Sequence, residues 1–158
     1  MVTLFEKRYS KFNNKITDDS ISEYFGIKDT NLKFKLFKKN DKNELYFNIY
    51  YLKPQEKINF KIVPNEINDI IYSYLNDYID IQVKIDYKID YPFDHPVWTL
   101  LHFSSNINSP WDLHDIFSFF LNCHNNQHIR DWSPATDIEK DILDFIRKIN
   151  IFEFIYTF

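Results

Sequence analysis

The segment that decides the fold is Ile79-Asp80-Ile81-Gln82-Val83-Lys84-Ile85-Asp86-Tyr87-Lys88-Ile89, which leads into Tyr91-Pro92-Phe93-Asp94-His95-Pro96. In the first run every odd position is apolar and every even position is polar. That alternation predicts a strand with one buried face and one exposed face. Pro92 ends the ladder because proline has no N–H to donate, and Pro96 keeps the following residues extended. We therefore expect Tyr78–Asp90 to pair antiparallel with a return strand at Val97–Phe103.

Upstream of this hairpin, the sequence predicts helices and then more strands. Thr3–Asn13 has apolar residues three or four positions apart, as on one face of a helix. Asp18–Phe25 is typical of a second, short helix that Gly26 ends. Three strand candidates then alternate with turn-forming residues, which together with the hairpin predicts an antiparallel meander. These candidates are Leu32–Lys38, Glu44–Leu52 and Lys57–Val63, and helical spacing follows at Ile67, Ile70, Ile71, Tyr74 and Leu75.

Downstream of the hairpin, two helices are predicted. Trp111–Asn122 has a pattern compatible with the first, and a polar stretch with histidines follows it up to Arg130. Thr136 and Glu139 form a capping-box pair that predicts the start of the second helix. The buried stripe expected for that helix consists of Ile138, Ile142, Phe145, Ile146 and Ile149. The apolar residues 151–158 are expected to pack back on the body.

Composition limits the possible functions of the chain. Its 158 residues suggest one domain, and a hydrophobic fraction of 44% supplies ample material for a core. A single glycine excludes a phosphate-binding glycine loop, and the net charge of −4 argues against a nucleic-acid partner. The basic run Lys33–Lys42 is interpreted as an exposed surface. One cysteine fits a reducing, cytoplasmic setting, and neither a signal peptide nor an apolar membrane span is recognised.

The order of these features resembles the ubiquitin-conjugating enzyme family. In that family a Tyr-Pro-Phe-x-x-Pro turn follows the third strand, and Trp-Ser-Pro-Ala-x-x-Ile leads into the second helix. The corresponding residues here are Tyr91–Pro96 and Trp132–Ile138, and the resemblance extends over Tyr78–Phe103 and Trp132–Ile149. It implies an α+β fold, an antiparallel β-meander flanked by helices. It also implies a single domain at residues 1–158, with insertions at 64–77 and 104–122.

The resemblance makes Cys123 the candidate catalytic residue, as a thioester carrier for ubiquitin or a ubiquitin-like protein. The family's cysteine lies eight or nine residues before the tryptophan of the second motif, and Cys123 lies nine before Trp132. A thiolate can take an acyl group from another thioester and pass it to a lysine amine. An activating enzyme or a ligase would then be a further partner, and no cofactor is needed.

Other interpretations of the same residues stay open. The family's oxyanion-binding asparagine, eight residues before its cysteine, is replaced here by Asp115, whose carboxylate would oppose a developing oxyanion. Asn106 or Asn108 could take its place. Alternatively, Cys123 could be buried as a small hydrophobe. The chain would then be an inactive binding module of the same fold, or a structural protein, viral for example, without ubiquitin chemistry.

The histidines raise a metal hypothesis that the sequence supports only weakly. His114, His124 and His128 could join Cys123 in a metal cluster. The spacing of Cys123 and His128 is not that of a zinc finger, and surface-loop histidines are the commoner case. No metal ligand is therefore assigned from the sequence, and no Ser-His-Asp motif with a nucleophile elbow is recognised.

Overall fold

The computed structural model describes residues 2–14, 32–38, 42–53, 64, 66–67, 70, 77–107 and 112–156. These residues form an α+β fold with one four-stranded antiparallel sheet and three helices. The elements in chain order are α1 (Leu4–Asn13), β1 (Leu32–Lys38), β2 (Glu44–Lys53), β3 (Asp77–Asp86), β4 (Val97–Ser105), α4 (Leu113–Asp131) and α5 (Ile138–Tyr156).

The sheet is a meander in which each strand pairs with the next one in the chain, in the order β1-β2-β3-β4. The predicted antiparallel pairing of β3 with β4 is confirmed, and Ile85 lies opposite Trp98. On the other side of β3, Val83 lies opposite Phe47 of β2. A bulge at Gln82/Val83 shifts the register of β4 by one residue. β1 and β4 are the edges of this sheet.

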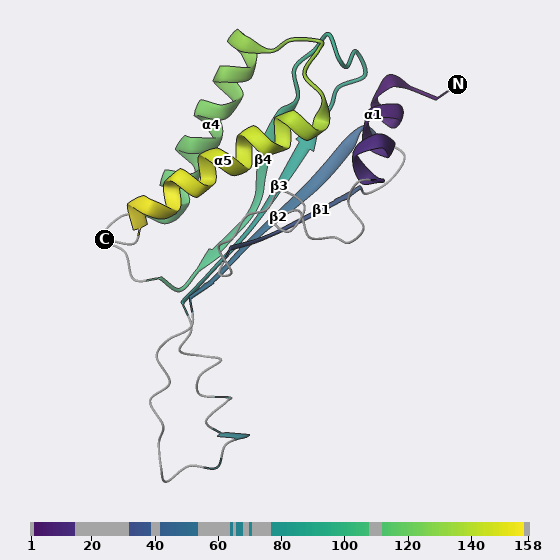
Figure 1. Ribbon diagram of the computed structural model, residues 1–158. Coiled ribbons are helices and arrows are strands. Elements are labelled where there is room, and N and C mark those ends of the chain that lie inside the picture. The colour runs from purple at the N-terminus through teal and green to yellow at the C-terminus, as the bar shows by residue number, and fades with distance from the viewer. Residues whose placement is uncertain are drawn as a thin grey trace.

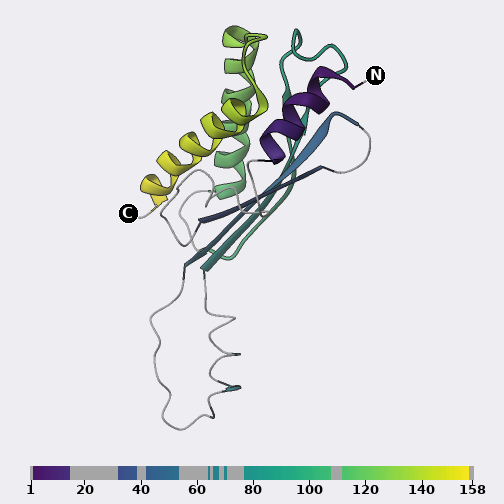
Figure 2. The ribbon, with the colours of Figure 1, turned by 45° about the vertical axis from the view of Figure 1, so that its right-hand side comes forward.

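Helices α4 and α5 cover one face of the sheet (Figures 1 and 2). The alternation that predicted β3 is the reason, because Ile81, Val83 and Ile85 point from β3 toward these helices and are buried. The helix α1 packs at one end of the same core, where the rings of Phe5 and Tyr87 lie 5.4 Å apart.

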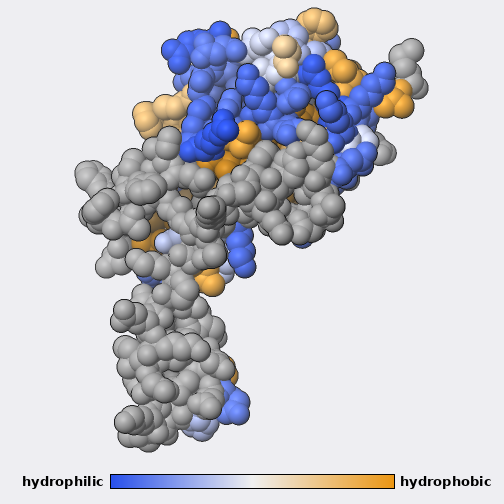
Figure 3. All heavy atoms as spheres, viewed as in Figure 1, coloured by the Kyte–Doolittle hydropathy of each residue, from blue (hydrophilic) through white to orange (hydrophobic). Residues whose placement is uncertain are grey.

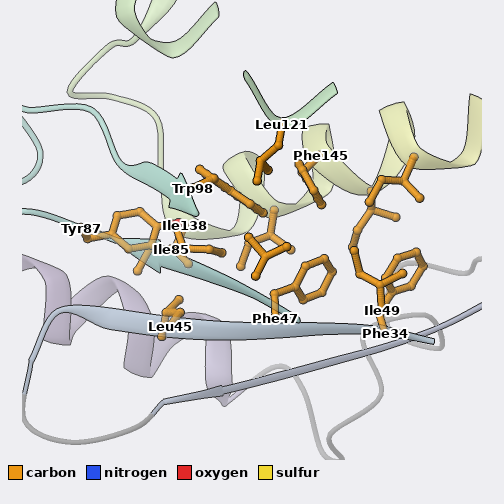
Figure 4. Close-up of a cluster of buried hydrophobic side chains, with 14 of the residues drawn as sticks. Phe34, Leu45, Phe47, Ile49, Ile85, Tyr87, Trp98, Leu121, Ile138 and Phe145 are labelled. Carbon is orange, nitrogen blue, oxygen red and sulfur yellow. The ribbon is translucent and has the colours of Figure 1, made fainter. Parts of the chain in front are cut away.

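The centre of the core is aromatic, as Figure 4 shows. The rings of Trp98 from β4 and Phe145 from α5 stack with their centroids 4.2 Å apart. Phe47 of β2 meets both rings edge-on, at 6.3 and 5.9 Å. The five residues of the predicted α5 stripe are all buried, which confirms the register of that helix: Ile138, Ile142, Phe145, Ile146 and Ile149.

Two predicted element boundaries were wrong. β3 ends at Asp86, and Ile89 is 92% exposed. The neighbouring strands supply the reason, because the pairing ends at Glu44 of β2 and Val97 of β4. One further hydrogen bond, from the N–H of Tyr87 to the carbonyl of Asn43 at 2.9 Å, follows Asp86. The helix expected over Trp111–Asn122 is instead α4, which continues through the polar stretch to Asp131.

The predicted cap of α5 was also wrong by one residue. Asp137, not Thr136, accepts the hydrogen bond from the backbone N–H of Lys140, at 2.9 Å, and the helix begins at Ile138. Thr136 instead offers its backbone carbonyl to Arg8 of α1. The helix predicted over Asp18–Phe25 and the strand over Lys57–Val63 lie outside the described residues. In the sheet, β2 is hydrogen-bonded directly to β3.

The surface over the helices is largely hydrophilic, with separate apolar side chains among the polar ones (Figure 3). Among the described residues, no helix combines the length and the apolar character that crossing a membrane requires.

Candidate functional site

Helix α4 carries most of the residues that the sequence marked as functional. Its N-cap is Asp112, whose carboxylate accepts hydrogen bonds from the N–H groups of His114 and Asp115, at 2.9 and 3.3 Å. Asn125 fixes the helix to β4. Its side-chain oxygen accepts from the N–H of Trp98 at 2.9 Å, and its side-chain nitrogen donates to the carbonyl of Trp98 at 2.8 Å. Because this pair of hydrogen bonds joins Asn125 to one residue of β4, α4 has a fixed inner face and a fixed outer face.

Cys123 lies on the outer face of α4, and its thiol is exposed. The interpretation that it is buried as a small hydrophobe is therefore excluded. A surface pocket beside the thiol is lined by Cys123, Asn126, Ile129 and Arg130. Asn126, one helical turn beyond the cysteine, lines the same pocket and was not singled out from the sequence. A helix predicted over 113–131 would have placed Asn126 beside Cys123, because residues three positions apart lie on the same face of a helix.

Asp115, at the oxyanion-binding position of the ubiquitin-conjugating family, lies far from Cys123. Asp115 is exposed in the first turn of α4, and eight residues of helix place it about 12 Å from the cysteine along the axis. Asn106 follows β4, and its side-chain oxygen accepts the N–H of Tyr78 at 2.7 Å. It thus closes the end of the β3–β4 hairpin. Asn108 lies outside the described residues.

The two sequence motifs contact each other directly. The indole N–H of Trp132 donates to the carbonyl of Pro92 at 2.8 Å, which joins the start of the second motif to the Tyr-Pro-Phe turn. Arg8 of α1 donates to the Tyr91 hydroxyl at 2.8 Å and to the carbonyl of Pro134 at 2.9 Å. The Tyr91–Pro92 peptide bond is cis. In this structure the motifs therefore hold the turn, the first helix and the entry to α5 together.

The inner face of α4 meets α5 at a buried cluster of titratable groups. His124 and His128, one turn apart on α4, face Asp141 in the first turn of α5. The His128 Nε2 lies 2.7 Å from the Asp141 Oδ1, and the His124 Nε2 lies 3.9 Å from the same oxygen. The side chains of His124 and Asp141 are 1% and 0% exposed. The prediction that the histidines lie in a surface loop was wrong for His124, because α4 carries it into the core.

Further polar groups surround this cluster. The Tyr87 hydroxyl donates to the Asp141 Oδ2 at 2.8 Å, and the ammonium of Lys148 lies 3.2 Å from the His124 Nδ1. Burial, then the electrostatic influence of His128 and Lys148, lowers the pKa of His124 to about 2. Burial and the negative charge of Asp141 raise the pKa of Tyr87 well above its ordinary value. His124 is consequently a neutral imidazole at neutral pH.

The structure separates the residues of the sequence-based metal hypothesis. His124 and His128 come together, whereas Cys123 and His114 are exposed and take no part in this buried cluster. His114 lies instead in an exposed group with Asp112 and Asp115. The third member of the buried cluster, Asp141, was missed. Its signal was weak because a carboxylate three residues after a helix start is ordinary.

Comparisons of the chain with protein-family models, with curated proteins and with solved structures give no match.

Proposed function

We propose that the chain is a protein-binding module built like a ubiquitin-conjugating domain, with the outer face of α4 as its contact surface. The observation that carries this proposal is the exposure of two large apolar side chains beside Cys123. Phe119 is 69% exposed and Ile129 is 63% exposed. Phe119, Cys123, Asn126 and Arg130 follow helical spacing and so form one stripe, with Ile129 at its side. We call these five residues the α4 stripe.

The element order supports the likeness to a ubiquitin-conjugating domain. A first helix precedes an antiparallel meander, a Tyr-Pro-Phe turn follows β3, and Trp132 opens the segment before α5. The partner that this likeness implies is ubiquitin or a ubiquitin-like protein. An aromatic and an aliphatic side chain beside an arginine form the kind of surface on which binding energy concentrates in protein interfaces.

The helical environment of Cys123 favours binding over transfer. A residue inside a regular α-helix donates its backbone N–H to the carbonyl four residues earlier, so the backbone around Cys123 has no donor left for an oxyanion. Asp115 is two turns away and has the wrong charge. Loss of an oxyanion donor costs about 3–4 kcal/mol of transition-state stabilisation, which slows transfer by roughly two to three orders of magnitude.

The test of binding is a titration of ¹⁵N-labelled ubiquitin with the unlabelled chain, followed by NMR. Phe119→Ala should weaken binding by about tenfold, as expected for a central apolar contact. The matched control is Phe93→Ala, because Phe93 is also exposed, at 79%, but lies in the turn between β3 and β4. Equal affinities of the two variants would exclude the α4 stripe as the contact surface. No binding at millimolar concentration would exclude ubiquitin as the partner.

A second candidate function, thioester carriage, is favoured by the exposed thiol of Cys123 at the family's spacing from Trp132. Its test is incubation with an activating enzyme, ubiquitin and ATP, followed by a non-reducing gel, with Cys123→Ser as the control. We expect little or no thiol-sensitive adduct. Rapid formation of the adduct, followed by discharge to free lysine, would establish the transfer function and overturn the proposal of an inactive module.

A further inference from the structure

In the part of the chain that the structure describes, the cluster between α4 and α5 contains most of the buried side-chain polar atoms without a hydrogen-bond partner. Among the described residues there are four such buried side-chain atoms: the Trp98 Nε1, the His124 Nε2, the His128 Nδ1 and the Asp141 Oδ1. Three of them belong to residues of this cluster, and two of these three, the His124 Nε2 and the Asp141 Oδ1, face each other at 3.9 Å. The contact between the His128 Nε2 and the Asp141 Oδ1 is short, at 2.7 Å, but does not have the direction of a hydrogen bond. Leaving buried polar atoms unpaired costs about 1–3 kcal/mol each, so such a concentration calls for an explanation.

We propose that His124, His128 and Asp141 form a zinc site that joins α4 to α5. Two imidazoles and one carboxylate are a donor set typical of Zn²⁺ with three protein ligands. One ligand atom from each residue lies within 4.8 Å of the other two. Zinc bonds of about 2.0–2.1 Å in tetrahedral geometry require ligand atoms roughly 3.3 Å apart. The distances from the two histidine Nε2 atoms to the Asp141 Oδ1, 2.7 and 3.9 Å, lie on either side of that value.

A hydrogen bond from outside the cluster orients one of the proposed ligands. Tyr87 holds the carboxylate from behind, since its hydroxyl donates to the Asp141 Oδ2 while the Oδ1 faces the histidines. An outer hydrogen bond of this kind orients a ligating carboxylate in metalloproteins. Tyr87 is therefore a positioning residue for Asp141.

Lys148 competes with the metal for His124. Its ammonium faces the His124 Nδ1, and when it donates there the Nε2 must carry the proton. Zinc at the Nε2 needs the proton on the Nδ1, so Lys148 must turn away. Gln127 offers the alternative acceptor, because its side-chain oxygen already contacts the same ammonium. Removal of Lys148 should accordingly tighten zinc binding.

The site is independent of the proposed binding surface. His124 and His128 are turned away from the α4 stripe, by about 140° and 180° from Phe119 and by about 100° and 140° from Cys123 at roughly 100° per helical residue. Rings on three sides enclose the imidazoles. His124 lies edge-on to Trp98 and Phe145, at 4.9 and 5.0 Å, and His128 lies edge-on to Trp132 at 5.5 Å. Bound zinc would fix the angle between two helices that no β-strand connects.

The experiment is a titration of the tag-free, chelator-treated chain with ZnCl₂ by calorimetry, with Co²⁺ as the spectroscopic probe. We expect one ion per chain and visible Co²⁺ bands of tetrahedral intensity. The Tm should rise by about 5 to 10 °C when free zinc is roughly one hundred times Kd. Absence of binding at micromolar metal would overturn the proposal.

Variants then assign the ligands. His128→Asn and Asp141→Asn should abolish the stoichiometric binding, whereas Cys123→Ser and His114→Asn, outside the cluster, should leave it unchanged. Tyr87→Phe keeps the ring and removes the hydroxyl, and it should weaken binding by about 10- to 100-fold. Lys148→Ala should strengthen binding. Near-ultraviolet circular dichroism of each metal-free variant checks its fold. If Asp141→Asn fails to fold, two other variants still distinguish this cluster from an exposed histidine or thiol. His128→Asn should abolish zinc binding, and Lys148→Ala should strengthen it.

Discussion

At the scale of single residues, two neighbouring positions compete as the N-cap of α5. Thr136 and Asp137 are both good capping residues, and only the backbone geometry decides between them. Asp137 caps the helix, while the Thr136 carbonyl accepts a hydrogen bond from Arg8 at 2.9 Å. A contact with a residue 128 positions away in the chain thus takes Thr136 out of the helix.

We expect Asp137→Ala to lower the free energy of unfolding by about 1 kcal/mol, because the N–H of Lys140 loses its acceptor. Urea denaturation followed by circular dichroism would measure this change. Thr136→Ala, the neighbouring variant, keeps the backbone carbonyl and should have a smaller effect. The reverse order of the two effects would restore Thr136 as the cap.

The tyrosines of the core predict a loss of stability at alkaline pH. Burial raises the pKa of Tyr91 in the folded chain, although the hydrogen bond from Arg8 partly lowers it again, and the pKa of Tyr87 is raised further. The neutral phenols therefore contribute stability that is fully present below the ordinary pKa of about 10. That stability is lost as the pH rises through the higher folded values. The free energy of unfolding should fall as the pH rises above about 10, and the fall should be shallower in Tyr91→Phe.

At the scale of elements, the spacing of apolar residues in the sequence correctly predicted elements that have one buried face. The alternation of β3 and the stripe of α5 each describe an element with one buried face, and both were confirmed. The continuation of α4 through residues 122–131 could not be predicted in this way. Asparagine and histidine are weak helix formers, and the contacts that hold them, from Asn125 to Trp98 and from His124 to the core, are long-range. The proposed zinc site depends on that helix, so the sequence pointed to His124 and His128 but not to their grouping with Asp141.

Ile142→Ala should lower the free energy of unfolding by about 2–5 kcal/mol, because Ile142 is fully buried at the middle of the α5 stripe. Ile89→Ala removes the same atoms from a side chain that is 92% exposed, and it should cost far less. Chemical denaturation of both variants gives the comparison. Similar losses would mean that Ile89 is covered in solution.

At the scale of the whole molecule, three distant segments meet at one arginine. Arg8 of α1 contacts the Tyr-Pro-Phe turn through Tyr91 and the entry to α5 through Pro134. The motif residues could be recognised from the sequence, but their joint contact with α1 could not, because nothing near Arg8 distinguishes it from Lys7 or Lys11.

Arg8→Met should lower the free energy of unfolding by about 1.5–3 kcal/mol, the range for hydrogen bonds made by a charged donor. Lys7→Met removes the same charge from an exposed neighbour on α1 and should change stability little. Thermal unfolding of the two variants measures the difference. If the two variants unfold alike, the contacts of Arg8 do not contribute to the stability of the fold.

The double hydrogen bond of Asn125 has a consequence for self-association. The N–H and C=O of Trp98 point away from β3, at an outer edge where another chain could add a strand. Asn125 occupies both groups and so blocks that backbone position against strand addition by a second copy. Asn125→Leu would leave the edge of β4 open beside an added apolar side chain. Light scattering should then show aggregation that grows with protein concentration, whereas the parent chain stays dispersed.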